Sequence, residues 1–188
     1  GGPVLAFVAA AVAWNRMLSR KVAAHTIALT RELERRREAE ESVRYHATHE
    51  PITGLPRRNQ FIDDAEDALA HAPAGQARDV LVFHINNIGN IVRVFGHATG
   101  EEAMRAFAER LRQSGLDVVG GFGGHTFGAV AIGSDSRQLI EALSRTVVVG
   151  SVDFDPVVVA GIAREWDEHI GAAELLRRAE TALARASG

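Results

Sequence analysis

The chain has 188 residues, and 46% of them are hydrophobic, which is enough for one packed domain and an additional segment. Its net charge of −3 and its pI near 6.3 give no positively charged surface of the kind that binds DNA or RNA, so we expect no nucleic-acid partner. The absence of cysteine excludes disulfides, thiolate catalysis and cysteine-based zinc sites.

Residues 3–14 (PVLAFVAAAVAW) are apolar without interruption. This run of about 12 residues is shorter than the roughly 20 that cross a bilayer. Arg16, Arg20 and Lys21 follow it directly, as the positive-inside rule expects at the cytoplasmic exit of a membrane helix. We therefore interpret residues 1–16 as the end of a membrane span. The alternative is an apolar segment that is buried or forms a dimer in a soluble protein.

Residues 17–46 contain neither glycine nor proline and are rich in Ala, Leu, Glu and Arg, which predicts one long helix. Positions spaced by three and four residues approximate a heptad that is apolar early and polar later: Leu18, Val22, His25, Leu29, Leu33, Arg36, Ala39 and Val43. We interpret this segment as a parallel two-chain coiled coil that carries a signal. A solvated linker helix remains the alternative.

The remainder, residues 47–188, alternates between helical and strand patterns. Residues 80–85 form a near-continuous apolar run, which is typical of a strand buried on both faces. Gly123 and Gly124 separate two further strands as a hairpin turn. The pattern predicts an α+β fold with a palm-like mixed sheet flanked by helices. The expected helices are 57–70, 91–95, 103–111, 134–147 and 167–186, and the expected strands are 80–85, 118–122, 126–132 and 157–163.

Four stretches of this region resemble GGDEF domains, the diguanylate cyclases of bacterial cyclic di-GMP signalling. HEPITGLPRR (49–58) is similar to the opening of that domain, and GGFGGHTF (120–127) stands where its signature turn is expected. VFHINNIGNIVRVFGHATGEE (82–102) and AAELLRRAETALARAS (172–187) resemble its central and closing segments. The resemblance implies a nucleotide-cyclase fold over residues 47–188.

Active members of this family bind GTP with two divalent cations and join two nucleotides into cyclic di-GMP. The resemblance implies that their metal-binding carboxylates fall on His84 and His125 here. The acid that follows in the signature falls on Thr126, and the second Asp of the family's DxD pattern falls on Asn86. Mg²⁺ requires hard oxygen ligands, and imidazole is a poor substitute. We therefore expect no catalytic residue at these four positions.

The resemblance also implies a damaged nucleotide site. The asparagine that reads guanine falls on Val92, which cannot hydrogen-bond a base, while the acid that pairs with the base is kept as Glu101. Backbone N–H groups at Asn87, Ile88 and Gly89 remain as vestigial phosphate contacts. We therefore expect no cofactor, and bound GTP with Mg²⁺ is possible but not favoured.

His84 and His125 are expected to lie close together, one at a strand end and one at the hairpin tip. Zn²⁺, Ni²⁺ and Cu²⁺ accept imidazole ligands, but two histidines without a third ligand make a weak site. The favoured interpretation is that no metal binds and that two polar side chains fill a vacated cleft.

These inferences predict a catalytically inactive GGDEF-like module of the kind found in GGDEF–EAL proteins. It is expected to form a homodimer through its N-terminal helix and to pass a membrane signal to a downstream EAL phosphodiesterase domain. Its place would be the cytoplasmic side of the bacterial inner membrane. Two alternatives stay open, namely a GTP-binding allosteric module and a divergent active cyclase.

Overall fold

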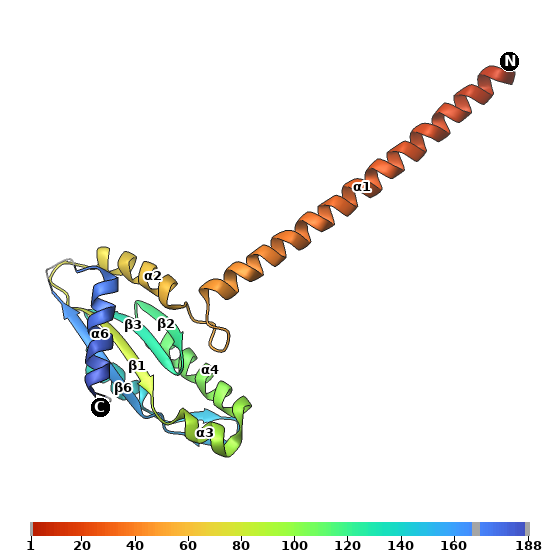
Figure 1. The fold of residues 1–188 in the computed structure, drawn as a ribbon. Helices are drawn as coiled ribbons and strands as arrows, with labels where there is room; N and C mark the ends of the chain where they lie inside the picture. The colour runs from red at the N-terminus through yellow and green to blue at the C-terminus, as the bar shows by residue number, and fades with distance from the viewer. Residues whose placement is uncertain (1, 167–169, 187–188) are drawn as a thin grey trace. The chain divides into compact units, whose positions relative to one another are not determined.

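A computed structural model describes residues 2–166 and 170–186 of the chain (Figure 1). The chain divides into two compact units, Gly1–Tyr45 and His46–Gly188. The described residues of the first unit, 2–45, all belong to helix α1 (Gly2–Thr48), which runs without a break through both the apolar segment and the polar segment that follows it. In the described part of the chain, no helix combines the length and the hydropathy that a membrane crossing requires.

The second unit is an α+β domain, which confirms the expected fold class. It is built on a four-stranded sheet in the order β2-β3-β1-β6 (Figure 1). The sheet strands are β1 (Arg78–Ile85), β2 (Val118–Gly123), β3 (Thr126–Ile132) and β6 (Val158–Glu165), and the helices are α2 (Arg58–Ala70), α3 (Ile88–Phe95), α4 (His97–Gln113), α5 (Ser136–Leu143) and α6 (Ala172–Ala186).

The strand directions correct one expectation. We expected a mixed sheet, but β1 pairs antiparallel with both β3 and β6, and β2 pairs antiparallel with β3. The connections explain why. The helices α3 and α4 lead from β1 to the parallel strand β2, and α5 leads from β3 to the parallel strand β6, but each pair is split by a strand of opposite direction. The parallel strands are therefore never neighbours.

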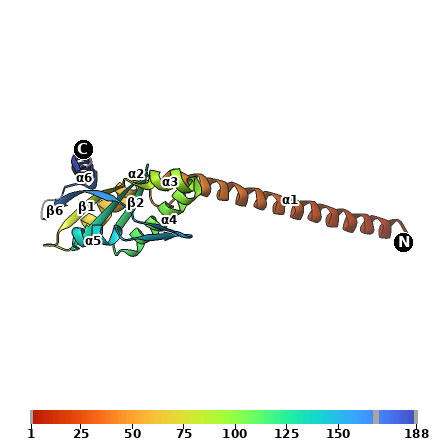
Figure 2. The same cartoon turned by 90° about the horizontal axis from the view of Figure 1, so that it is seen from below.

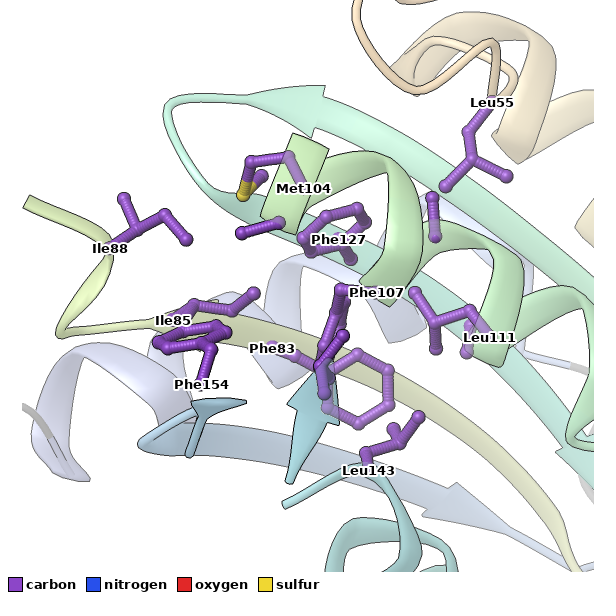
Figure 3. Close-up of a cluster of buried hydrophobic side chains, with 14 of the residues drawn as sticks. Leu55, Phe83, Ile85, Ile88, Met104, Phe107, Leu111, Phe127, Leu143 and Phe154 are labelled. Atoms are coloured by element: carbon purple, nitrogen blue, oxygen red, sulfur yellow. The ribbon is translucent and has the colours of Figure 1, made fainter. Parts of the chain in front are cut away.

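Both faces of the sheet are covered, which explains the continuous apolar run in β1. Val80 and Val82 face one side and join a cluster with residues of α2 and α6. Leu81, Phe83 and Ile85 face the other side and pack with α3, α4 and α5 (Figure 3). Helices α6 and α5 lie on opposite sides of the sheet in Figure 2. The burial of residues 80–85 on both faces thus arises within an antiparallel sheet.

The expected helix 134–147 is shorter than predicted. Helix α5 begins after Asp135, whose side chain accepts a hydrogen bond from the backbone N–H of Arg137, and it ends at Leu143. The following residues form an unexpected small hairpin of β4 (Val147–Val149) and β5 (Val152–Phe154). The closing helix α6 begins at Ala172, and positions 167–169 of its predicted range lie outside the described residues. Phe154 of the hairpin completes the core beneath α4 (Figure 3).

Candidate functional site

The candidate site lies where β1 ends beside the β2–β3 hairpin. His84 stands opposite Thr126 in the register of β1 and β3. The backbone N–H of Ile85 donates to the carbonyl of His125 at 3.1 Å, so the pairing continues to the tip of the hairpin. Two segments that are about 40 residues apart are thereby held side by side, which is why the predicted pair of histidines meets.

The tip of this hairpin has an unusual backbone. Gly123, Gly124 and His125 have consecutive positive φ angles of 78°, 55° and 66°, and the β2–β3 register shifts between Gly121 and Gly123. Glycine adopts such angles freely, whereas an L-residue does so at a cost. His125 is the non-glycine residue with positive φ in the described chain. The two glycines predicted a turn, but the strained position of His125 becomes visible only in three dimensions.

The two imidazoles lie next to each other without sharing a hydrogen bond in the structure. Their ring centroids are 6.3 Å apart and their planes are tilted by 45°. His84 Nδ1 lies 3.1 Å from the hydroxyl of Thr126, which fixes the orientation of the His84 ring. Partial burial, with a smaller contribution from His84, lowers the pKa of His125. A neutral imidazole is therefore favoured at the hairpin tip.

His125 and Thr126 border a small cavity of about 180 Å³. Ligand pockets usually occupy about 300–1,000 Å³, so the cavity is too small to enclose a whole nucleotide. Among the predicted site residues, Ile88, Glu101, His125 and Thr126 line it, together with the following: Glu50, Ile52, Thr53, Val92, His97, Gly100, Met104, Gly121, Gly123, Gly124 and Phe127. The cavity is thus bounded by the β2–β3 hairpin, by α3 and α4, and by the loop before α2.

Val92 occupies one wall of the cavity. Its Cγ2 atom would lie 2.5 Å from a Cβ atom placed on Gly100, so the α3–α4 contact depends on the absence of a side chain there. Glu101, the carboxylate kept in the expected base-reading pair, accepts a hydrogen bond from Arg105 at 2.9 Å on the exposed face of α4. The resemblance implies two groups that recognise guanine here. In their place the chain has the apolar side chain of Val92 and a Glu101 that is paired with Arg105.

Sequence reasoning missed Glu50 as a residue of this site. Its carboxylate accepts hydrogen bonds from the backbone N–H groups of Ile52 and Thr53, at 3.1 and 2.8 Å, and from the Thr53 hydroxyl at 2.7 Å. A glutamate before Pro51 and Gly54 was the available signal, since acidic side chains often close such turns. Glu50 therefore lines the cavity, but its oxygens are committed to holding the loop.

The strand end after His84 is committed to the fold in a similar way. The Asn87 side chain donates to the carbonyl of Asp155 at 2.7 Å and accepts from the backbone N–H of Val157 at 2.9 Å. Asn86 is exposed, and its backbone N–H donates to the carbonyl of Val157. Ile88 is buried in the core, and the neighbouring Gly89 is exposed. Of the three predicted backbone contacts, Ile88 alone borders the cavity.

The histidine pair does not extend into a larger metal-binding cluster. Among the side chains that the structure describes, which exclude those of residues 3–13 and 18–28, no three of His, Cys, Asp or Glu are grouped closely enough to hold an ion. His84 and His125 therefore provide two ligands, short of the three or four that protein zinc sites use.

Comparison with known proteins agrees with this geometry. The family model described as "Diguanylate cyclase, GGDEF domain" matches residues 47–187. Escherichia coli diguanylate cyclase DgcM is 27% identical over 169 residues, covering 85% of this chain and 41% of DgcM. Escherichia coli cyclic di-GMP phosphodiesterase PdeR is 25% identical over 159 residues, covering 78% of this chain and 23% of PdeR.

The fold also has solved counterparts. A sensory box/GGDEF family protein from Caulobacter crescentus superposes with a TM-score of 0.64 at 25% identity, covering 74% of this chain and 97% of that structure. The chain spans only 19% to 41% of the length of the curated relatives that it matches. Since the family model covers three quarters of the sequence and its fold is reproduced, the chain belongs to the GGDEF domain family of cyclic di-GMP signalling proteins.

Proposed function

We propose that this GGDEF domain is catalytically inactive and serves as a regulatory module. The observation that carries the proposal is the set of side chains at the end of β1 and at the hairpin tip. His84, Asn86, His125 and Thr126 stand at the four positions for which the family resemblance implies acidic residues. Joining two nucleotides at an α-phosphate needs metal ions that spread the phosphate charge, and those ions need oxygen ligands.

The local chemistry supports this proposal. A neutral imidazole offers Mg²⁺ a nitrogen ligand, although Mg²⁺ prefers oxygen and retains its waters. The Thr126 hydroxyl is already bonded to His84, and the carboxylate of Glu50, in the loop that lines the cavity, is bonded to the backbone. Val92 also brings methyl groups to the wall where a base would need a hydrogen-bond partner. Both metal binding and base recognition would therefore be weak.

The wider role follows from the same proposal. The named relatives include a diguanylate cyclase and a cyclic di-GMP phosphodiesterase. Similarity to this domain is therefore compatible with either activity in the longer protein. We propose that the module forms a homodimer through α1 and passes a signal to a downstream output domain, an EAL phosphodiesterase domain. Its upstream segment would attach it to the bacterial inner membrane, with the domain in the cytoplasm.

The direct test is a turnover assay on the purified chain. GTP is incubated with the protein and either Mg²⁺ or Mn²⁺, and cyclic di-GMP is quantified by liquid chromatography and mass spectrometry, with DgcM as the positive control. We expect no product above the protein-free blank. Product that forms with the wild-type chain and disappears in His125→Ala would overturn the proposal and favour a divergent active cyclase.

A second candidate function is a module that binds GTP without turning it over. The retained cavity beside the glycine turn and the retained Glu101 favour it. Calorimetric titration with a non-hydrolysable GTP analogue and Mg²⁺ separates the two, with Val92→Asn as the variant that restores a base-reading amide. Absence of binding heat at millimolar nucleotide supports a regulatory module that does not bind GTP. Micromolar binding by the wild-type chain would make the allosteric module the better description.

A further inference from the structure

Helix α1 carries an exposed stripe that is apolar at both ends and charged in the middle. The stripe consists of Leu29, Leu33, Arg36, Glu40 and Val43, and we call it the α1 stripe. Its members are spaced by 4, 3, 4 and 3 residues, so at 3.6 residues per turn they share an arc of about 80° on one side of the helix. A spacing that averages 3.5 residues is the pattern by which two helices wind around each other.

The apolar members of the α1 stripe face solvent in the single chain. Leu29, Leu33 and Val43 are 61%, 53% and 70% exposed. A helix of 47 residues gains most of its stability from packing an apolar face rather than from intrinsic propensity. Large exposed aliphatic side chains at this spacing therefore indicate a helical partner along the stripe.

The charged members are paired with each other. Arg36 Nε lies 3.3 Å from Glu40 Oε1, and their side chains are 77% and 67% exposed in the single chain. The α1 stripe therefore contains one cation and one anion between its apolar ends. In a parallel, in-register pair with a second copy, Arg36 faces Arg36 of the partner and Glu40 faces Glu40 of the partner. These two positions follow each other along the stripe, so each arginine can pair with a glutamate of the other helix across the two neighbouring layers.

We propose that Arg36 and Glu40 form a polar layer inside a parallel, in-register dimer of α1, where they make ion pairs between the two helices. This inference rests on the dimeric relay proposed above and names the residues that set its register and its strength. In a parallel pair, Leu33 packs on Leu33 of the partner and Val43 on Val43 of the partner. The polar layer between them consists of two neighbouring positions, one with both Arg36 side chains and one with both Glu40 side chains.

The polar layer has an energetic consequence. Polar residues at core positions of a coiled coil fix register and partner number at the expense of stability. A buried ion pair is commonly no better than apolar side chains of similar size, because both charges lose their hydration. The middle of the dimer is therefore its weakest section, and it lies between the N-terminal part of α1 and the GGDEF domain.

The first test compares two double variants of the full chain. Arg36→Leu/Glu40→Leu makes the α1 stripe fully apolar, and Arg37→Leu/Glu41→Leu is the matched control, because it removes a pair of the same order and spacing just outside the stripe. Dimer dissociation constants are measured by sedimentation equilibrium. We expect the first variant to bind at least about tenfold tighter than wild type and the control to stay within about twofold.

The second test asks whether the charges meet between chains. The Arg36→Glu variant carries two acidic side chains on each helix, at positions 36 and 40. The Glu40→Arg variant carries two basic side chains at the same positions. Each should dimerise at least about fivefold more weakly than wild type, because all four side chains of the two polar positions then carry the same sign of charge and no ion pair can form between the helices. When the two variants carry different tags and are mixed, native mass spectrometry should show that the heterodimer predominates over both homodimers.

The outcomes separate this inference from the proposal beneath it. A wild-type chain that stays monomeric throughout the concentration range overturns both the dimeric relay and the polar layer. A wild-type dimer that tightens no more with Arg36→Leu/Glu40→Leu than with the control overturns the polar layer alone. Because the chain has no cysteine, Leu33→Cys also tests direction, and absence of an interchain disulfide under mild oxidation would refute the parallel, in-register pairing.

Discussion

The two ends of strand β1 use opposite kinds of side chains. At its beginning, Asp79 is fully buried and accepts hydrogen bonds from Arg164 Nε and Nη2, both at 2.6 Å, and from the hydroxyl of Ser136. Its neighbour Arg78 pairs with the buried Glu165, whose second oxygen accepts from the backbone N–H of Ile170 at 2.8 Å. Carboxylates here join β1 to β6 and α5.

The end of β1 has no such carboxylate. His84 stands opposite Thr126 and shares one hydrogen bond with it at 3.1 Å, and His125 lies beside them at the hairpin tip. All three side chains are half-buried, and Thr126 and His125 line the cavity. The chain keeps acidic groups where they tie strands together and has none in β1 where the family resemblance implies metal ligands. This contrast is expected of a domain that keeps the residues that stabilise its fold and lacks those that would bind metal ions.

The largest effect is expected at the beginning of β1. Asp79→Ala removes the acceptor of three hydrogen bonds and leaves Ser136 buried without it. Breaking a buried pair costs about 3–5 kcal/mol, and Arg164, which is half-exposed, recovers part of this through hydration. We expect a loss of about 3 kcal/mol in the free energy of unfolding, measured by urea denaturation.

Ser136→Ala is the control for that variant, because it removes one hydrogen bond and leaves the ion pair intact. It should cost about 1 kcal/mol. Equal losses in the two variants would mean that the Asp79–Arg164 pair contributes no net stability, and the contrast between the two ends of β1 would then lose its energetic basis.

A smaller effect of opposite sign is expected at the hairpin tip. His125 has φ of 66°, which costs an L-residue about 1–2 kcal/mol, whereas glycine accepts that angle. His125→Gly should therefore be more stable than His125→Ala by about 1 kcal/mol, since alanine keeps the strain. Thermal denaturation of both variants measures this difference, and a more stable alanine variant would contradict the strain at this position.

A pH-dependent effect is expected to be the smallest change in stability. The pKa of His125 is lowered in the folded state, so the unfolded chain binds this proton more readily. Stability from this group is therefore complete above the ordinary histidine pKa of about 6.5 and declines as pH falls from there towards the folded pKa. Urea midpoints at pH 7.5 and 5.5 should differ more for wild type than for His125→Ala, and equal differences would remove His125 as the cause.

The pKa of His125 can also show the effect of a carboxylate at position 84. His84→Asp replaces a neighbour that lowers the pKa of His125 with one that attracts a proton, so that pKa should rise, although burial continues to oppose it. An NMR titration of the His125 ring measures the shift, and His84→Asn serves as the uncharged control. If both variants gave the same pKa, the two side chains would be too far apart to interact electrostatically.

Much of the fold could be predicted from local patterns. The run 80–85 predicted a buried strand, the pattern of residues 57–70 predicted α2, and the glycine pair predicted the hairpin. The antiparallel order could not be read locally, because apolar runs look the same in any sheet that is covered on both faces. The β4–β5 hairpin was missed because two three-residue strands are too short to show a period.

The sequence by itself determined which residue types occupy the site positions, because His84, Asn86, His125 and Thr126 are read directly from the chain. Only the tertiary structure decided how they are used. It bonds His84 to Thr126, ties the Asn87 side chain to residues 155 and 157, commits Glu50 to its own loop and sets Val92 against Gly100. The physical reason is that most of these contacts join distant segments, whose meeting depends on strand order and helix packing rather than on local spacing.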